Sequence, residues 1–221
     1  MKKIIIPLLI GAGILAAGPA AFASKIDGVD VEVKVGTLGA GLNVNYAINR
    51  KFTVGLGLNK FSRSTSDNAD NIDYDVNLDL QTLALLGNYH PFAGTFHLTA
   101  GLMHNGNELK MKAKPTSSYD IGGSTYTAAE VGTLEATVDF KSMVPYLGLG
   151  WGKSSGRGFG VTFDIGILFQ GSPNVSFTSN GSLANDPTFQ ANLKQEEANA
   201  ENDIKGFTKY PVISLGLNYR F

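Results

Sequence analysis

The chain has 221 residues, a length that fits one domain, and its 18 basic and 19 acidic side chains leave a formal net charge of −1. This balance argues against nucleic acid as a partner, because nucleic-acid-binding domains carry a clear basic excess. There is no cysteine, which excludes disulfides, thiolate metal sites and thiol nucleophiles.

Residues 1–23 have the pattern of a secretory signal peptide. Two lysines at positions 2 and 3 precede an apolar run over residues 4–17, and the segment ends in Ala-Phe-Ala at 21–23, a typical cleavage site. The run is shorter than the roughly 20 residues that a membrane-spanning helix needs, which argues against an anchor. We expect cleavage near Ala23 and a mature chain over residues 24–221.

The mature chain begins with alternating residues. Valines at 29, 31, 33 and 35 alternate with charged residues at 30, 32 and 34, and after Gly36-Thr37-Leu38-Gly39 the alternation changes phase. The pattern fits two strands joined by a tight turn, or one long strand with a bulge, since a bulge also shifts the phase by one residue.

Further strands are expected along the rest of the chain. The clearest alternation lies over 159–169 and 213–221, where one face is apolar and the other carries Asp164 and Arg220. Weaker patterns lie over 54–58, 76–86, 96–102 and 138–151. With the two N-terminal segments the total is eight strands, and their apolar and polar faces suggest a barrel with lipid outside and a polar interior.

The connections between these strands alternate in length. Those at 49–50, 91–95 and 152–158 are short, and those at 62–74, 104–137 and 171–208 are long and polar. This alternation predicts an all-β fold, an eight-stranded antiparallel transmembrane β-barrel with short periplasmic turns and long extracellular loops. The alternative is a soluble β-sandwich or a lipocalin-like barrel.

Aromatic residues cluster near the predicted strand ends, as expected for rings at two membrane–water interfaces. The short-turn end carries Tyr89, Phe92, Trp151, Tyr219 and Phe221, and the long-loop end carries Phe61, Tyr74, Phe169 and Tyr210.

The chain ends in Ser214-x-Gly216-x-x-Tyr219-x-Phe221. This pattern resembles the C-terminal signal of bacterial outer-membrane barrels, which the barrel-assembly machinery recognises. The whole mature chain resembles the small eight-stranded barrels of the OmpA/OmpX/OmpW-like group. The segments TLGAGLNVNY, NYHPFAGTFHLTAGL, VPYLGLGWG and LFQGSPNV are similar to an uncharacterised family of proteobacterial outer-membrane proteins. The resemblance implies the outer membrane of a Gram-negative cell, with its lipid and lipopolysaccharide as partners, and no defined activity.

An eight-stranded barrel has room inside only for its own side chains. The predicted lumen network consists of Glu32, Lys34, Asp79, His97, Asp164 and Arg220. We expect a satisfied polar plug in which Lys34 and Arg220 pair with the carboxylates. The same groups could instead line a narrow pore.

Catalysis and metal binding have little support in the sequence. The three histidines, His90, His97 and His104, have no nucleophile partner that the spacing fixes, and no set of ligands has metal-site spacing. We expect no enzyme activity, no metal and no cofactor.

Two features of the long connections predict structure. Lysines at 110, 112 and 114 and acidic residues at 135 and 139 alternate with apolar residues, which predicts two paired strand extensions with Lys–carboxylate pairs. The lysines could instead bind lipopolysaccharide phosphates. A helix is expected between Pro187 and Gly206, capping the barrel mouth.

These features favour a structural or surface-interaction role through the long loops. The alternatives are a narrow channel for small or apolar solutes and, third, a lipid-modifying enzyme.

Overall fold

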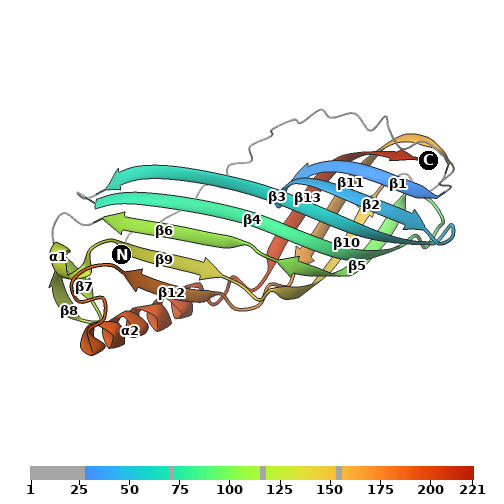
Figure 1. The fold of residues 1–221 in the computed structure, drawn as a ribbon. Helices are drawn as coiled ribbons and strands as arrows, with labels where there is room; N and C mark the ends of the chain where they lie inside the picture. Colours follow the sequence, from blue (N-terminus) through green and yellow to red (C-terminus); the bar gives the residue numbers. More distant parts are fainter. Residues whose placement is uncertain (1–27, 70–71, 115–117, 153–155) are drawn as a thin grey trace.

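The computed structural model describes residues 28–69, 72–114, 118–152 and 156–221. The predicted signal peptide therefore lies outside the described residues. Eight antiparallel strands close into a ring in the order β4-β3-β2-β1-β13-β11-β10-β5, with β5 returning to β4 (Figure 1). The ring strands are β1 (Val29–Gly36), β2 (Gly39–Ala47), β3 (Phe52–Ala69), β4 (Ile72–Tyr89), β5 (Phe96–Asn105), β10 (Met143–Trp151), β11 (Gly158–Leu168) and β13 (Tyr210–Arg220).

The first and last strands close the barrel. β1 pairs with β13 from Asp30↔Arg220 to Gly36↔Ser214, and with β2 on its other side from Val29↔Tyr46 to Gly36↔Gly39. A tight turn at 37–38 joins β1 and β2, with Gly39 at φ +92°, a backbone conformation that favours glycine. The two-strand interpretation of this segment is confirmed, and the bulge alternative is not.

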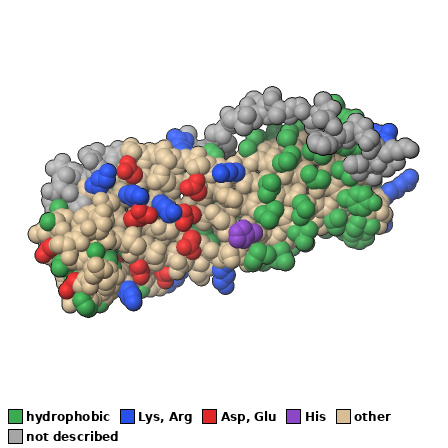
Figure 2. All heavy atoms as spheres, in the orientation of Figure 1, with side chains coloured by type: hydrophobic (Ala, Val, Ile, Leu, Met, Phe, Trp, Pro, Cys, Tyr) green, Lys and Arg blue, Asp and Glu red, His purple; other side chains and the backbone are tan. Residues whose placement is uncertain are grey.

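Alternation along the ring strands places apolar side chains on the outer surface. Leu56, Val161 and Leu217 are 59%, 62% and 60% exposed, whereas their neighbours Gly57, Thr162 and Asn218 are buried. On the face drawn in Figure 2, hydrophobic side chains gather over the barrel part of the molecule. This continuous apolar surface is far larger than the apolar patches that soluble proteins usually expose.

An aromatic girdle surrounds the short-turn end of the barrel. Ring contacts with centroids 4.9–6.3 Å apart connect Phe52 with Tyr89, Phe92 with Phe96, Trp151 with Phe96 and Phe163, and Tyr219 with Phe159 and Phe221. The predicted girdle at the long-loop end is wrong in part. Tyr210 packs against the buried cluster inside the barrel, and Tyr74 lies in β4 beyond the ring.

The wall of the barrel continues beyond the ring as a second sheet. β4 pairs with β5 from Tyr89 to Thr82, and beyond that point it pairs with β6 (Glu108–Lys114) from Asp79 to Asp73. β9 (Leu134–Asp139) and β12 (Asn174–Ser179) follow beside β6. Together with the far halves of β3 and β4, these three strands make a five-stranded sheet, which we call the distal sheet. Figure 1 shows it extending away from the ring.

The predicted long loops are therefore largely ordered. Residues 62–69 and 72–74 belong to the β3–β4 hairpin, whose register is unbroken from Phe52↔Tyr89 to Ala69↔Ile72. The predicted strand over 138–151 is two strands, β9 in the distal sheet and β10 in the ring. Apolar residues continue across the point where pairing passes from β6, the partner of β9, to β5, the partner of β10. The sequence pattern therefore did not mark the break between the two strands.

The far end of the distal sheet has its own small core. It combines β7 (Ser118–Ile121), β8 (Ser124–Thr127), α1 (Ala128–Val131) and α2 (Pro187–Ile204). The buried residues there are Ile121, Val131, Phe189 and Leu193. Asp186 caps α2 by accepting from the Thr188 and Phe189 amides. None of the helices in the described part of the chain is both long and apolar enough to cross a membrane.

The predicted helix exists, but it does not cap the barrel mouth. α2 lies along β12, the edge strand of the distal sheet (Figure 1). Its Glu201 and Glu197 accept hydrogen bonds from the backbone amides of Val175 (3.0 Å) and Phe177 (2.8 Å). Four helical residues rise about 6 Å and two strand residues about 6.6 Å, so one helix face matches alternate amides of the strand.

Candidate functional site in the barrel lumen

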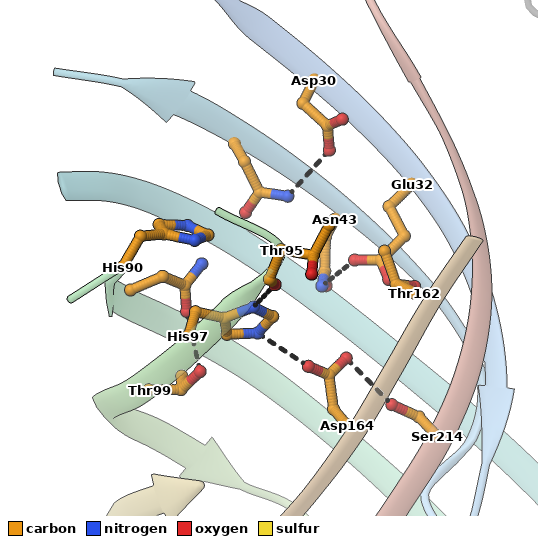
Figure 3. A network of polar contacts seen from close by, with 12 residues as sticks. Asp30, Glu32, Asn43, His90, Thr95, His97, Thr99, Thr162, Asp164 and Ser214 are labelled. Carbon is orange, nitrogen blue, oxygen red and sulfur yellow. Dashed lines mark hydrogen bonds and ion pairs between the residues drawn. The ribbon is translucent and has the colours of Figure 1, made fainter. Parts of the chain in front are cut away.

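Two carboxylates of β1 form the centre of a polar network inside the barrel (Figure 3). Both oxygens of Glu32 are engaged, one by the Asn43 amide at 2.7 Å and the other by the Thr162 hydroxyl. Two residues earlier on β1, the Asp30 carboxylate accepts hydrogen bonds from the Asn45 side chain at 3.2 Å and from the Asn218 side chain. Glu32 is only 4% exposed, and these donors from β2 and β11 offset the cost of burying its carboxyl group.

A second centre joins β5, β11 and β13. The Nε2 atom of His97 lies 2.9 Å from Oδ1 of Asp164, and the Ser214 hydroxyl lies 3.5 Å from the other carboxylate oxygen. The remaining ring nitrogen of His97 faces the Thr95 carbonyl at 3.4 Å, and its ring centroid is 5.2 Å from that of His90. These contacts fix His97 in place (Figure 3).

Glycines make the room that these large side chains need. A Cβ at Gly57 would collide with the Asn43 side chain, and one at Gly150 would collide with Asp164. The Tyr146 ring lies across Gly166 in the same way. At these positions the absence of a side chain on glycine leaves space for a larger inward-facing side chain nearby.

A layer of apolar side chains closes the lumen on the side toward the distal sheet. Its buried members are Leu38, Ala84, Leu86, Met103, Val144, Tyr146, Leu168 and Val212. Tyr210 packs against the layer, and its hydroxyl donates to the Thr37 carbonyl at 2.6 Å. The predicted polar plug therefore does not extend into this half of the barrel, where apolar packing fills the lumen.

The space left inside is small. A cavity of about 80 Å³ lies along the polar network. The Oδ1 atoms of Asn43 and Asn218 line it as buried acceptors without a protein donor among the described residues. A space of this size and polarity suits a few water molecules, which would satisfy those acceptors.

Five of the six predicted lumen residues line this cavity, namely Glu32, Lys34, His97, Asp164 and Arg220. Asp79 does not. Its side chain is exposed on the outside of the wall, because β4 turns Leu80, Thr82 and Ala84 inward instead. Glu32 and Asp164 accept hydrogen bonds from Asn43, Thr162 and His97. The predicted pairing of Lys34 and Arg220 with the carboxylates stays a prediction.

Asp30 was missed by the sequence analysis as a lumen residue. It shares the phase of Glu32, and it lies opposite Asn45 on β2 and Arg220 on β13. The alternation of charged residues in β1 could have identified it.

The terminal residues divide as the pattern of the last strand predicts: Ser214 and Gly216 are buried, and Tyr219 and Phe221 join the aromatic girdle. Recognition of this strand by an assembly machinery stays a prediction.

The arrangement offers no catalytic constellation in the described residues. No histidine nitrogen there lies within hydrogen-bond distance of a serine or threonine hydroxyl, and His104 is exposed on β5. Among the same residues, no three histidine or acidic side chains are placed to hold a metal ion.

The predicted lysine pairs lie on the distal sheet. Lys112 pairs with Glu135 across β6 and β9 at 3.1 Å, as expected. Lys110 instead contacts Glu108 on its own strand at 2.8 Å, and the hydrogen bond and charge of Glu108 raise the pKa of Lys110. The side chains of both pairs are 30–42% exposed to solvent, so the pairs contribute little to stability.

No known protein-family model matches the sequence, and no curated protein matches it. Two solved structures are similar to it. The crystal structure of Acinetobacter baumannii CarO aligns with a TM-score of 0.55 and 21% identity over 89% of this chain and 98% of CarO. That of Acinetobacter baumannii CarO2 aligns with a TM-score of 0.56 and 21% identity over 90% of this chain and 100% of CarO2. The chain has the fold of a small outer-membrane β-barrel. The likeness is one of fold, and it spans both the ring and the distal sheet.

Proposed function

We propose that this protein is a closed outer-membrane barrel that anchors the distal sheet outside the cell as an interaction platform. The apolar outer face and the aromatic girdle support the membrane location, since both are typical of outer-membrane barrels. The short turns then face the periplasm and the distal sheet faces the exterior.

The single observation that carries the closed-barrel proposal is the apolar layer across the lumen. Leu168 and Val144 are 0% and 1% exposed, so almost none of their surface could line a water-filled channel through the barrel. An eight-stranded barrel is filled by its own side chains by default. This packing favours an anchor over the alternative of a narrow channel.

The distal sheet supports the platform role. It has a core of its own around Phe189 and Leu193, separate from the lumen cluster. Rigid, separately packed structure beyond the membrane has no use in holding the barrel itself together. Binding surfaces are commonly carried by such extensions on a rigid scaffold.

Planar-bilayer recording separates the anchor from the channel. The wild-type chain should give no steady conductance steps. A variant with the layer truncated, Leu86→Ala with Met103→Ala and Tyr146→Ala, should conduct if it folds, which shows that the assay detects an opened lumen. Steady steps from the wild-type chain would refute the proposal and favour the channel.

A further inference from the structure

One edge of the distal sheet is covered and the other is open. On the covered edge, α2 satisfies the outward amides of β12 with Glu197 and Glu201. On the opposite edge, β2 pairs with β3 only as far as Ala40↔Lys60. From Phe61 to Ala69, β3 has β4 as its one partner strand among the described residues.

The direction of the free backbone groups follows from two hydrogen bonds at the start of β3. The Phe52 carbonyl accepts from Ile48 on the β2 side, whereas the Lys51 carbonyl accepts from His90 on the β4 side. The β3–β4 register is unbroken, so even-numbered residues keep facing away from β4. The amides and carbonyls of Ser62, Ser64 and Ser66 therefore point outward from the open edge.

The open edge has few of the features that protect exposed strands. Its register with β4 has no bulge, its sequence has no proline, and the side chains at 62, 64, 65 and 66 are small and exposed. Arg63 is the one positive charge between Phe61 and Ala69. An edge of this kind is a template for an added strand.

We propose that the open edge of β3, residues 61–69, binds an extended peptide segment of another protein by β-strand addition. The proposal rests on the proposed function and names its partner class. The added strand runs antiparallel to β3, the more stable arrangement, and carries an acidic residue opposite Arg63.

A second copy in the same membrane does not fit this edge. Pairing of one edge with the same edge of another copy is necessarily antiparallel. β3 runs away from the barrel (Figure 1), so an antiparallel second copy would place its barrel at the opposite end. The occupant is therefore a different polypeptide that reaches the sheet from outside.

The test uses the full mature chain in detergent micelles and a fluorescent nine-residue peptide, TVTVEVTVT. Saturable binding by fluorescence anisotropy is expected. Ser64→Pro should weaken binding at least tenfold, because it removes an outward amide and spares the hydrogen bonds to β4. The matched control, Ser64→Ala, keeps that amide and should bind within twofold of wild type.

A charge exchange provides a second test that needs no proline. Arg63→Glu should weaken binding of the glutamate peptide and strengthen binding of the same peptide with lysine at its centre. Heat-modifiable gel migration checks that each variant is folded. Absence of saturable binding to wild type, or binding unaffected by both Ser64→Pro and Arg63→Glu, would overturn the proposal. A wild-type dimer that Ser64→Pro converts to a monomer would assign the edge to a second copy and would also overturn it.

Failure here is distinguishable from failure of the proposed function. A chain that gives no conductance and binds no peptide keeps its role as a closed anchor and loses only the edge site. A chain that conducts loses the proposed function whatever the peptide does.

Discussion

The carboxylate of Glu201 lies 3.0 Å from the backbone nitrogen of Val175 and accepts a hydrogen bond from that amide. Four residues earlier on α2, Glu197 does the same for Phe177 at 2.8 Å. A helix thus takes the place of a neighbouring strand and supplies side-chain acceptors to an edge that would otherwise face water. One edge of the distal sheet is therefore protected by a helix, whereas the opposite edge, in β3, is open.

Removing this acceptor should loosen β12. Glu201→Ala should speed hydrogen exchange at residues 174–179 about tenfold, since a hydrogen bond to a charged group contributes about 1.5–3 kcal/mol. Glu201→Gln keeps an acceptor oxygen and should change exchange less. Mass spectrometry of the exchanged peptide is the measurement. Equal exchange in both variants and wild type would show that α2 does not hold this edge.

Two lumen hydroxyls should differ in what they contribute to stability. Thr162 donates to the buried carboxylate of Glu32, whereas Thr99 donates to the neutral side chain of Asn88 at 2.8 Å. We expect Thr162→Val to lower the free energy of unfolding by about 2 kcal/mol and Thr99→Val by about 1 kcal/mol. Urea unfolding in lipid vesicles measures both. The reverse order would contradict the assignment of Glu32 as the central charge.

The glycine at 166 should resist substitution. An added Cβ there would overlap the Tyr146 ring, whereas one at Gly87 would meet only the Ala100 carbonyl at 3.7 Å. Gly166→Ala should cost about 1–3 kcal/mol by overpacking, and Gly87→Ala should fold normally. The folded fraction is read from heat-modifiable gel migration. Equal folding of the two variants would mean that Tyr146 does not lie across Gly166.

The outer belt should reject charge. Leu56 is 59% exposed on the outer face of β3, and Leu56→Arg should cost about 2–4 kcal/mol if the residue lies near the bilayer midplane. Ser64→Arg, on the same strand but in the distal sheet, serves as the control and should change little. Unfolding in vesicles measures both variants. A harmless Leu56→Arg would argue that this face meets water.

Sequence alone predicted those strands whose two faces differ. β11 alternates apolar residues with polar residues or glycines over 159–167, and β13 does so over 213–220, so their lumen residues Asp164 and Arg220 were correct. β4 defeated the same reasoning, because Leu80, Ala84 and Leu86 face the lumen while Leu83 and Leu85 face outward. A strand that is apolar on both faces carries no period-two signal, and its phase was assigned wrongly.

The distal sheet was hidden for the opposite reason. The far half of β3, with the sequence SRSTSDNA, carries small polar residues on both faces and was interpreted as loop. Its strand conformation depends on pairing with β4 and not on its own composition. The network around Glu32 and Asp30 was only partly predictable. Thr162 reaches Glu32 from β11 across the intervening strand β13, and Asn218 bonds diagonally to Asp30, so both contacts depend on the stagger of the ring.

The most direct test of the account asks whether the outer face of the ring lies in lipid. Trp151 is the only tryptophan of the chain, and it is 45% exposed in the aromatic girdle between Phe96 and Phe163. In vesicles of brominated lipids its fluorescence should be strongly quenched, more by bromines near the headgroup than by bromines near the chain end. Acrylamide in the water should quench it weakly. Strong acrylamide quenching with none from any brominated lipid would contradict the membrane barrel.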